Sequence, residues 1–93
     1  MNGRYQSVSV VIPTYNRRSG LERALSALAS DTARSSPERV EVVVVDDGSS
    51  DGTHEWLRAQ RYPFAIQALR QANAGPAAAR NAGLRAATGE FAH

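Results

Sequence analysis

The sequence predicts an α/β fold, a three-layer sandwich in which helices cover both faces of a mainly parallel sheet. The first observation is the run VEVVVV at residues 40–45, which is almost continuously apolar, as in a strand that is buried on both faces. The second is the order of the segments, because strand-like and helix-like patterns alternate along the chain. Parallel strands joined in this way have right-handed crossovers, which place helices against the sheet.

The first two segments are a strand and an amphipathic helix. Residues 7–16, SVSVVIPTYN, begin with β-branched side chains and become polar after Pro13, so we expect the strand to break there. In residues 19–30, Ser19 and Glu22 have the spacing of a capping box. Four apolar side chains in the same stretch recur at helical spacing, namely Leu21, Ala24, Leu25 and Leu28.

The later segments repeat this alternation. The buried strand is followed by a turn rich in Asp, Gly and Ser, in which Asp51 is placed to accept hydrogen bonds from the start of a short helix. A weaker strand is predicted at residues 64–69. A helix is predicted within residues 71–90, with Pro76 near its first position and Gly89 near its end.

Length, charge and cysteine content narrow the classes of function. Ninety-three residues allow at most one domain, which we assign to residues 1–93. The net charge of +2 comes from scattered arginines without a long basic run, so we expect no nucleic-acid partner. The absence of cysteine excludes disulfides and thiolate metal sites. No apolar stretch approaches the roughly 20 residues of a membrane span, and the expected location is cytoplasmic.

A polar turn follows each predicted strand. These turns contain Pro13, Thr14, Tyr15 and Asn16, then Asp46, Asp47 and Gly48, and finally residues 73–75, which end in Gly75. Ligands of parallel α/β sheets bind beyond the carboxyl ends of the strands, so we expect the three turns to face one crevice. Since successive side chains of a strand point to opposite sides, only one of Asp46 and Asp47 is expected to face it. Carboxylates, backbone amides, an aromatic ring and arginines suit a ligand with a base, a ribose and a phosphate chain.

Three segments resemble a known family. They are VSVVIPTYNR at residues 8–17, VEVVVVDDGSSDGT at 40–53 and NAGPAAARNAGLRAATGE at 73–90. In this order they resemble the amino-terminal motifs of the family-2 glycosyltransferases, which have the nucleotide-diphospho-sugar transferase fold called GT-A. The resemblance implies the donor-binding half of an enzyme that transfers a glycosyl group, with inversion, from a nucleotide-diphospho-sugar, usually a uridine diphosphate (UDP) sugar, to an acceptor.

The resemblance also implies roles for single residues. The segment from Pro13 to Tyr15 would wrap the base, Asp47 would accept a hydrogen bond from it, and Arg80 would lie near the base and the diphosphate. The chemistry agrees, because uracil presents an N–H donor and a carboxylate is the strongest side-chain acceptor for it. An arginine offers a charged fork to a phosphate. The predicted nucleotide-binding residues are Pro13, Thr14, Tyr15, Asn16, Asp46, Asp47, Gly48, Gly75 and Arg80, and no catalytic residue is assigned.

One motif of the family is missing. Its Asp-x-Asp element, which holds Mg²⁺ or Mn²⁺ against the diphosphate, does not occur in these 93 residues. The resemblance implies that metal ligands, general base and acceptor site belong to a missing carboxyl-terminal half, with the sheet truncated after about three βα units. We therefore expect the 93 residues alone to be inactive, because nothing would neutralise the departing diphosphate. Membrane association is left open for the longer protein.

Other interpretations compete with these. Asp46 and Asp47 both suit the solvation of a turn and the capping of the next helix, and Tyr15 suits the cover of the sheet end. Arg80 suits a solvated helix face, and Gly75 with Pro76 suits plain helix capping. At the level of function, the alternative to an enzyme is a non-catalytic nucleotide-binding or interaction module that ends at His93. Reading the gene past the His93 codon separates the two.

Overall fold

The sheet contains parallel strands throughout the part of the chain that the computed structural model describes, residues 8–32, 37–87 and 90–92. The strands lie in the order β3-β2-β1-β4. Their bounds are β1 (Val8–Thr14), β2 (Val40–Asp46), β3 (Ala65–Arg70) and β4 (Glu90–Ala92). The helices are α1 (Arg18–Thr32), α2 (Thr53–Arg58) and α3 (Pro76–Ala86), with a 3-10 turn, η2 (Pro37–Arg39), before β2. The predicted α/β fold with a parallel sheet is confirmed.

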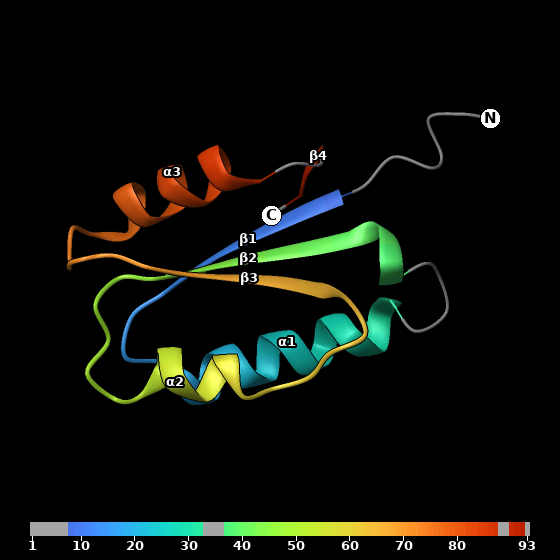
Figure 1. Cartoon of the computed structure of the whole chain (residues 1–93), viewed down its shortest axis with the longest axis horizontal. Coiled ribbons are helices and arrows are strands. Elements are labelled where there is room, and N and C mark those ends of the chain that lie inside the picture. Colours follow the sequence, from blue (N-terminus) through green and yellow to red (C-terminus); the bar gives the residue numbers. More distant parts are fainter. Residues whose placement is uncertain (1–7, 33–36, 88–89, 93) are drawn as a thin grey trace.

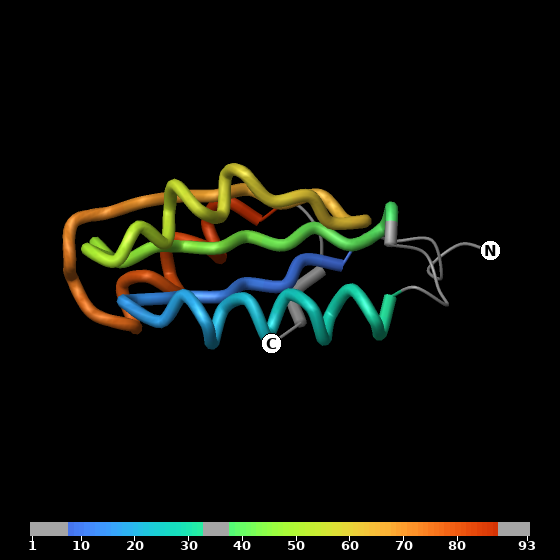
Figure 2. Tube along the Cα trace, turned by 90° about the horizontal axis from the view of Figure 1, so that it is seen from below, coloured from blue at the N-terminus to red at the C-terminus, as the bar shows by residue number. Residues whose placement is uncertain are grey.

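The helices form two layers on opposite faces of the sheet. Helix α3 lies on one face, and α1 and α2 lie on the other (Figures 1 and 2). The valines of β2 serve both layers in alternation, which explains why the run at residues 40–45 shows no polar face. One core cluster contains Leu21, Leu25, Val42, Val44, Leu57 and Phe64. The cluster under α3 contains Val11, Val43, Val45 and Ala79.

The first strand extends slightly further than predicted. It continues through Pro13 to Thr14, where Pro13 lies opposite Val45 of β2. A proline is normally excluded from an inner strand because it has no N–H to donate. Here β4 pairs only with residues 8–10 of β1, so Pro13 lies where the described sheet has β2 as its sole neighbour. The prediction that the strand breaks at Pro13 is therefore wrong by one residue.

The first and last residues of the helices also differ in part from those that the sequence predicts. Helix α1 begins at Arg18, so Ser19 lies inside the helix and the predicted capping box is not formed. Its Ala24 is exposed, while Leu21 and Leu25 are buried. Helix α3 begins at Pro76 as predicted but ends at Ala86, before Gly89, which lies outside the described residues. None of the helices in the described part has the length and apolar character needed to cross a membrane.

Candidate functional site

A cleft of about 410 Å³ opens beyond the carboxyl ends of β1, β2 and β3. Its walls come from the turns after these strands and from the first turns of α3. The lining residues are Pro13, Thr14, Tyr15, Arg17, Asp47, Asn73, Gly75, Pro76 and Ala79. The three turns that the sequence singles out therefore face one cleft.

Asp47 is the only carboxylate among the described residues that line this cleft. Its Oδ1 atom accepts hydrogen bonds from Gln71 Nε2 and Ala74 N, both at 2.8 Å, and its Oδ2 atom accepts one from Gly75 N at 2.9 Å. A carboxylate offers about four acceptor positions, so one remains on Oδ2. Asp47 is only 4% exposed and lines the cleft, so a ligand in the cleft is the partner available to this fourth acceptor position.

The three hydrogen bonds also fix the charge of Asp47. The amide of Gln71 and then the N–H of Ala74 hold the pKa of this carboxyl below its ordinary value of 3.8, against a smaller effect of burial that raises it. The N–H of Gly75 lowers the pKa further. Asp47 is therefore ionised at neutral pH. The ligand group that meets its free acceptor position must donate a hydrogen bond.

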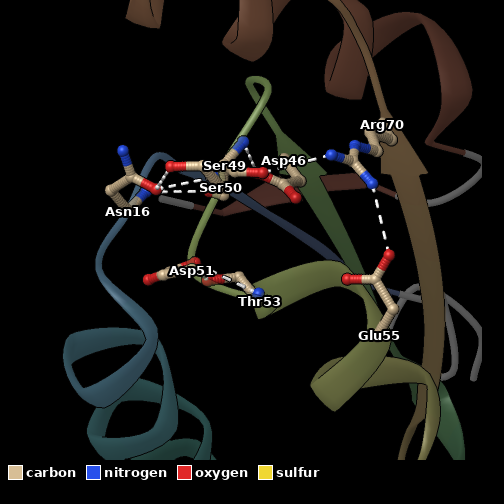
Figure 3. Close-up of polar contacts among 8 residues, drawn as sticks. All are labelled: Asn16, Asp46, Ser49, Ser50, Asp51, Thr53, Glu55 and Arg70. Atoms are coloured by element: carbon tan, nitrogen blue, oxygen red, sulfur yellow. Dashed lines mark hydrogen bonds and ion pairs between the residues drawn. The ribbon is translucent and has the colours of Figure 1, made fainter.

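Asp46 lies next to Asp47 but does not reach the cleft. It is 1% exposed, and its Oδ1 accepts a hydrogen bond from Ser49 N at 2.9 Å. Its Oδ2 has no hydrogen-bond partner among the described residues. Arg70, opposite Asp46 in the β2–β3 register, donates from Nη2 to the carbonyl oxygen of Ser49 at 3.1 Å (Figure 3). Asp46 thus shapes the turn that carries Asp47.

Asn16 joins the turn after β1 to the turn after β2. Its N–H donates to Ser49 Oγ at 2.8 Å, and its Oδ1 accepts from Ser50 N at 2.8 Å (Figure 3). The residue has a φ of 49°, in the left-handed region that asparagine tolerates better than most residues. Asn16 therefore braces the site from outside the cleft.

Asp51 caps two helices. It accepts hydrogen bonds from the N–H of Thr53 at 3.1 Å and from the Thr53 hydroxyl, which confirms the predicted bond to the start of α2. Its other oxygen accepts from the N–H of Arg18, the first residue of α1, at 3.4 Å. This long-range contact takes the place of the capping box predicted at Ser19.

Gly48 lets the second and third turns approach each other closely. Its φ is +84°, and a β-carbon at this position would lie 3.0 Å from the backbone nitrogen of Asn73. Asn73 in turn donates from Nδ2 to the carbonyl oxygen of Asp47 at 3.1 Å. Gly48 itself does not line the cleft, so its contribution is to the shape of the site.

The family is shown by sequence comparison. A model of the glycosyl transferase family 2 matches residues 9–92. The chain belongs to this family. It is 46% identical over 83 residues to a validoxylamine A glucosyltransferase of Streptomyces hygroscopicus subsp. limoneus, an alignment that covers 87% of this chain and 18% of the relative. It is 35% identical over 86 residues to the uncharacterized glycosyltransferase YibD of Escherichia coli K12, covering 90% of this chain and 24% of the relative.

Solved structures agree with this assignment. The crystal structure of Staphylococcus aureus TarS 1–349 in complex with UDP-GlcNAc matches with a TM-score of 0.78 and 34% identity, over 91% of this chain and 25% of TarS. The mannosyltransferase PcManGT from Pyrobaculum calidifontis, in complex with GDP-Man and Mn²⁺, matches with a TM-score of 0.72 and 32% identity, over 90% and 25% of the chains. The predicted GT-A fold is confirmed, and this family-2 chain spans about a quarter of either structure.

The structure separates the predicted site residues of this glycosyltransferase chain into two groups. Those in the cleft are Pro13, Thr14, Tyr15, Asp47 and Gly75. Asn16, Asp46 and Gly48 do not line the cleft, and neither does Arg80, which is exposed on α3.

Sequence reasoning missed three lining residues, Arg17, Pro76 and Ala79, whereas Asn73 lies in the third predicted turn but was not assigned to ligand binding. Arg17 directly follows the turn PTYN, which was the available signal for it.

The described residues do not fit the metal that the family implies. Across residues 8–32, 37–87 and 90–92, no three His, Asp or Glu side chains come together as a metal-binding group. The role that the described residues of this family-2 chain can support is therefore the binding and orientation of a ligand in the cleft.

Gln71 controls the acidity of Asp47, which gives a first testable expectation. In Gln71→Ala the strongest hydrogen bond that lowers the pKa is lost, so the pKa of Asp47 should rise toward 3.8. The stabilisation that the ionised carboxylate provides is fully present above that ordinary value and is lost as the pH falls through the lower folded-state pKa. The variant should therefore unfold at a higher pH on acidification.

Carbon-detected NMR titration of the Asp47 carboxyl measures the pKa, and an acid-unfolding curve measures the stability. Gln67→Ala is the matched control, since Gln67 is exposed on the neighbouring strand β3. An unchanged or lower pKa of Asp47 in Gln71→Ala contradicts the expectation.

Proposed function

We propose that the cleft binds the nucleotide of a nucleotide-diphospho-sugar, and that the chain is the donor-binding half of an inverting, hexosyltransferase-type enzyme. The observation that carries the proposal is the ionised Asp47, held by three hydrogen bonds with one acceptor position left for a ligand. A fixed carboxylate of this kind selects a ligand that presents an N–H.

The chemistry of the bases points to uracil as the first candidate. Uracil and guanine both present a ring N–H at the pairing edge, whereas cytosine and adenine present an unprotonated ring nitrogen there. The structural neighbours TarS and PcManGT were solved with UDP-GlcNAc and GDP-Man, whose bases both carry this N–H. We propose a UDP-sugar donor because the single free acceptor position of Asp47 matches the single ring N–H of uracil.

The other residues then have supporting roles. Tyr15, whose side chain is 48% exposed in the cleft, stacks on the base, and Pro13, Thr14 and Gly75 enclose it. Asn16, Asp46 and Gly48 keep the turns in place. Arg80 remains a predicted contact to the donor, reached from the exposed face of α3. We propose that the full-length protein, meaning the whole gene product that contains these 93 residues, binds Mg²⁺ or Mn²⁺ and contains the acceptor site.

Calorimetric titration of UDP and CDP into the full-length protein tests the proposal. UDP should bind about tenfold or more tightly than CDP, because the ring nitrogen of cytosine has no N–H to donate to Asp47 and a hydrogen bond to a charged group is lost. Equal affinities for the two nucleotides, or no binding of UDP, would overturn the proposal.

A further inference from the structure

We infer that Arg17 supplies a positive charge to the diphosphate of the donor, in addition to the metal proposed for the full-length protein. This inference rests on the proposed function, because it concerns the part of the same ligand that lies beyond the base. It assigns to Arg17 the role of a specificity-determining residue, one that separates nucleoside diphosphates from nucleosides.

The first step concerns the amino end of α3, the obvious alternative site for a phosphate. The N–H groups of Ala74 and Gly75 both donate to the carboxylate of Asp47, at 2.8 and 2.9 Å. Pro76 opens the helix and has no N–H. Two of the backbone donors at this helix end are therefore directed at an anion of the protein rather than at a ligand, so the positive charge that a phosphate needs comes from another residue.

The second step concerns the charges that line the cleft. Asp47 carries a negative charge there, so a diphosphate in the same cleft needs a cation to offset the repulsion. Among the described residues that line the cleft, Arg17 is the sole cation. Arg80 lies outside the lining, on the exposed face of α3.

The third step is that the guanidinium of Arg17 is available. Across the described ranges, no ion pair and no hydrogen bond joins the side chain of Arg17 to another residue. An arginine fork binds phosphate oxygens in pairs, which gives orientation as well as attraction.

The fourth step is the position of Arg17 between two hollows. Besides the cleft, Arg17 lines a second hollow of about 330 Å³, together with Asn16, Arg18, Ser19 and Asp51. Arg17 is thus the residue that the lining of the cleft shares with the lining of this second hollow. This arrangement suits a long ligand in which a phosphate chain follows the base.

Titration of uridine, UMP and UDP into the full-length protein and its Arg17→Gln variant tests the inference. In the variant the affinity for UDP should fall about tenfold to a hundredfold, the range for a lost hydrogen bond between charged groups, while the affinity for uridine stays within about twofold. Arg17→Lys should recover part of the loss, because it restores the charge without the fork. Arg85→Gln is the matched control, since it removes the same charge from an exposed position of α3 outside both hollows.

The outcomes separate this inference from the proposed function. If the wild-type protein prefers UDP to CDP but Arg17→Gln binds UDP normally, the proposed function stands and the inference is wrong. Equal losses for uridine and UDP in a variant that melts like the wild type also overturn it, because Arg17 would then act on the base end. A loss in Arg85→Gln as large as in Arg17→Gln overturns it as well, since the effect would be one of net charge. If neither UDP nor uridine binds the wild type, both proposals fall together.

Discussion

Replacing Asp47 with asparagine is expected to lower the affinity of the full-length protein for UDP about tenfold to a hundredfold, the range for a lost hydrogen bond to a charged group. Asparagine has the same shape but a single acceptor oxygen, whereas Asp47 already receives donors on both oxygens. The N–H₂ must therefore face donors in either orientation: Gln71 Nε2 and Ala74 N–H if it replaces Oδ1, or Gly75 N–H and the ring N–H of the base if it replaces Oδ2. Calorimetric titration of UDP measures the loss.

Asp46→Asn is the matched control for this change. It alters the adjacent carboxylate, which is buried and lies outside the cleft lining. The affinity for UDP should change much less than in Asp47→Asn, and a thermal melt of each variant shows whether the fold is retained. Equal losses at the two positions, or a larger loss at Asp46, would overturn the assignment of Asp47 to the base.

Replacing Gly83 with alanine is expected to destabilise the fold through the contact between α3 and the sheet. A β-carbon at Gly83 would lie 2.3 Å from Val11 Cγ1 and 3.2 Å from Val45 Cγ2. Both valines are buried and β-branched, so they have little freedom to move aside. Overpacking of this kind costs about 1–3 kcal/mol, and such a short contact belongs to the upper part of that range. This exceeds the gain of about 1 kcal/mol from better helix propensity.

Gly20→Ala provides the opposite expectation within α1. The nearest atoms to a β-carbon at Gly20 belong to Arg17 and lie 3.9 Å away, which is an ordinary contact. This variant should therefore gain about 0.5–1 kcal/mol from helix propensity. Urea unfolding of both variants measures the free energy of unfolding. A Gly83→Ala variant as stable as Gly20→Ala would show that α3 does not press against Val11.

The elements of the fold could be predicted because their signals are local. The valines that predict a strand all lie within residues 40–45, and the leucines that predict a helix, Leu21 and Leu25, are four positions apart. The start of α1 could not be predicted in the same way, since its first N–H is capped by Asp51, 33 positions further along the chain. The passage of β1 through Pro13 likewise depends on how far β4 extends, which is a property of the assembled sheet.

The site could be predicted to the level of turns but not of every side chain. Strand alternation anticipated that Asp46 and Asp47 would differ, and in the structure Asp47 lines the cleft whereas Asp46 is buried and does not line it. The position of Arg80 needed the structure, because the side of a helix that faces a cleft depends on how the helix is rotated on the sheet. Arg17 lies just before α1, and its place directly after the turn PTYN was the signal for it. The binding roles of these residues stay predictions until the titrations are made.

The strand order β3-β2-β1-β4 has a consequence for the synthesis of the protein on the ribosome. Strand β1 emerges first, yet it lies inside the sheet, between β2 and β4. As the chain is synthesised, β2 pairs with one side of β1 and β3 then pairs with β2. The other side of β1 stays unpaired until Glu90–Ala92 has been synthesised. At about 5–20 residues per second, translation of residues 15–89 takes on the order of 4–15 seconds. During that time residues 8–10 of the nascent chain expose backbone donors and acceptors that any other extended segment can pair with, so a chaperone that shields this edge should raise the yield of folded protein.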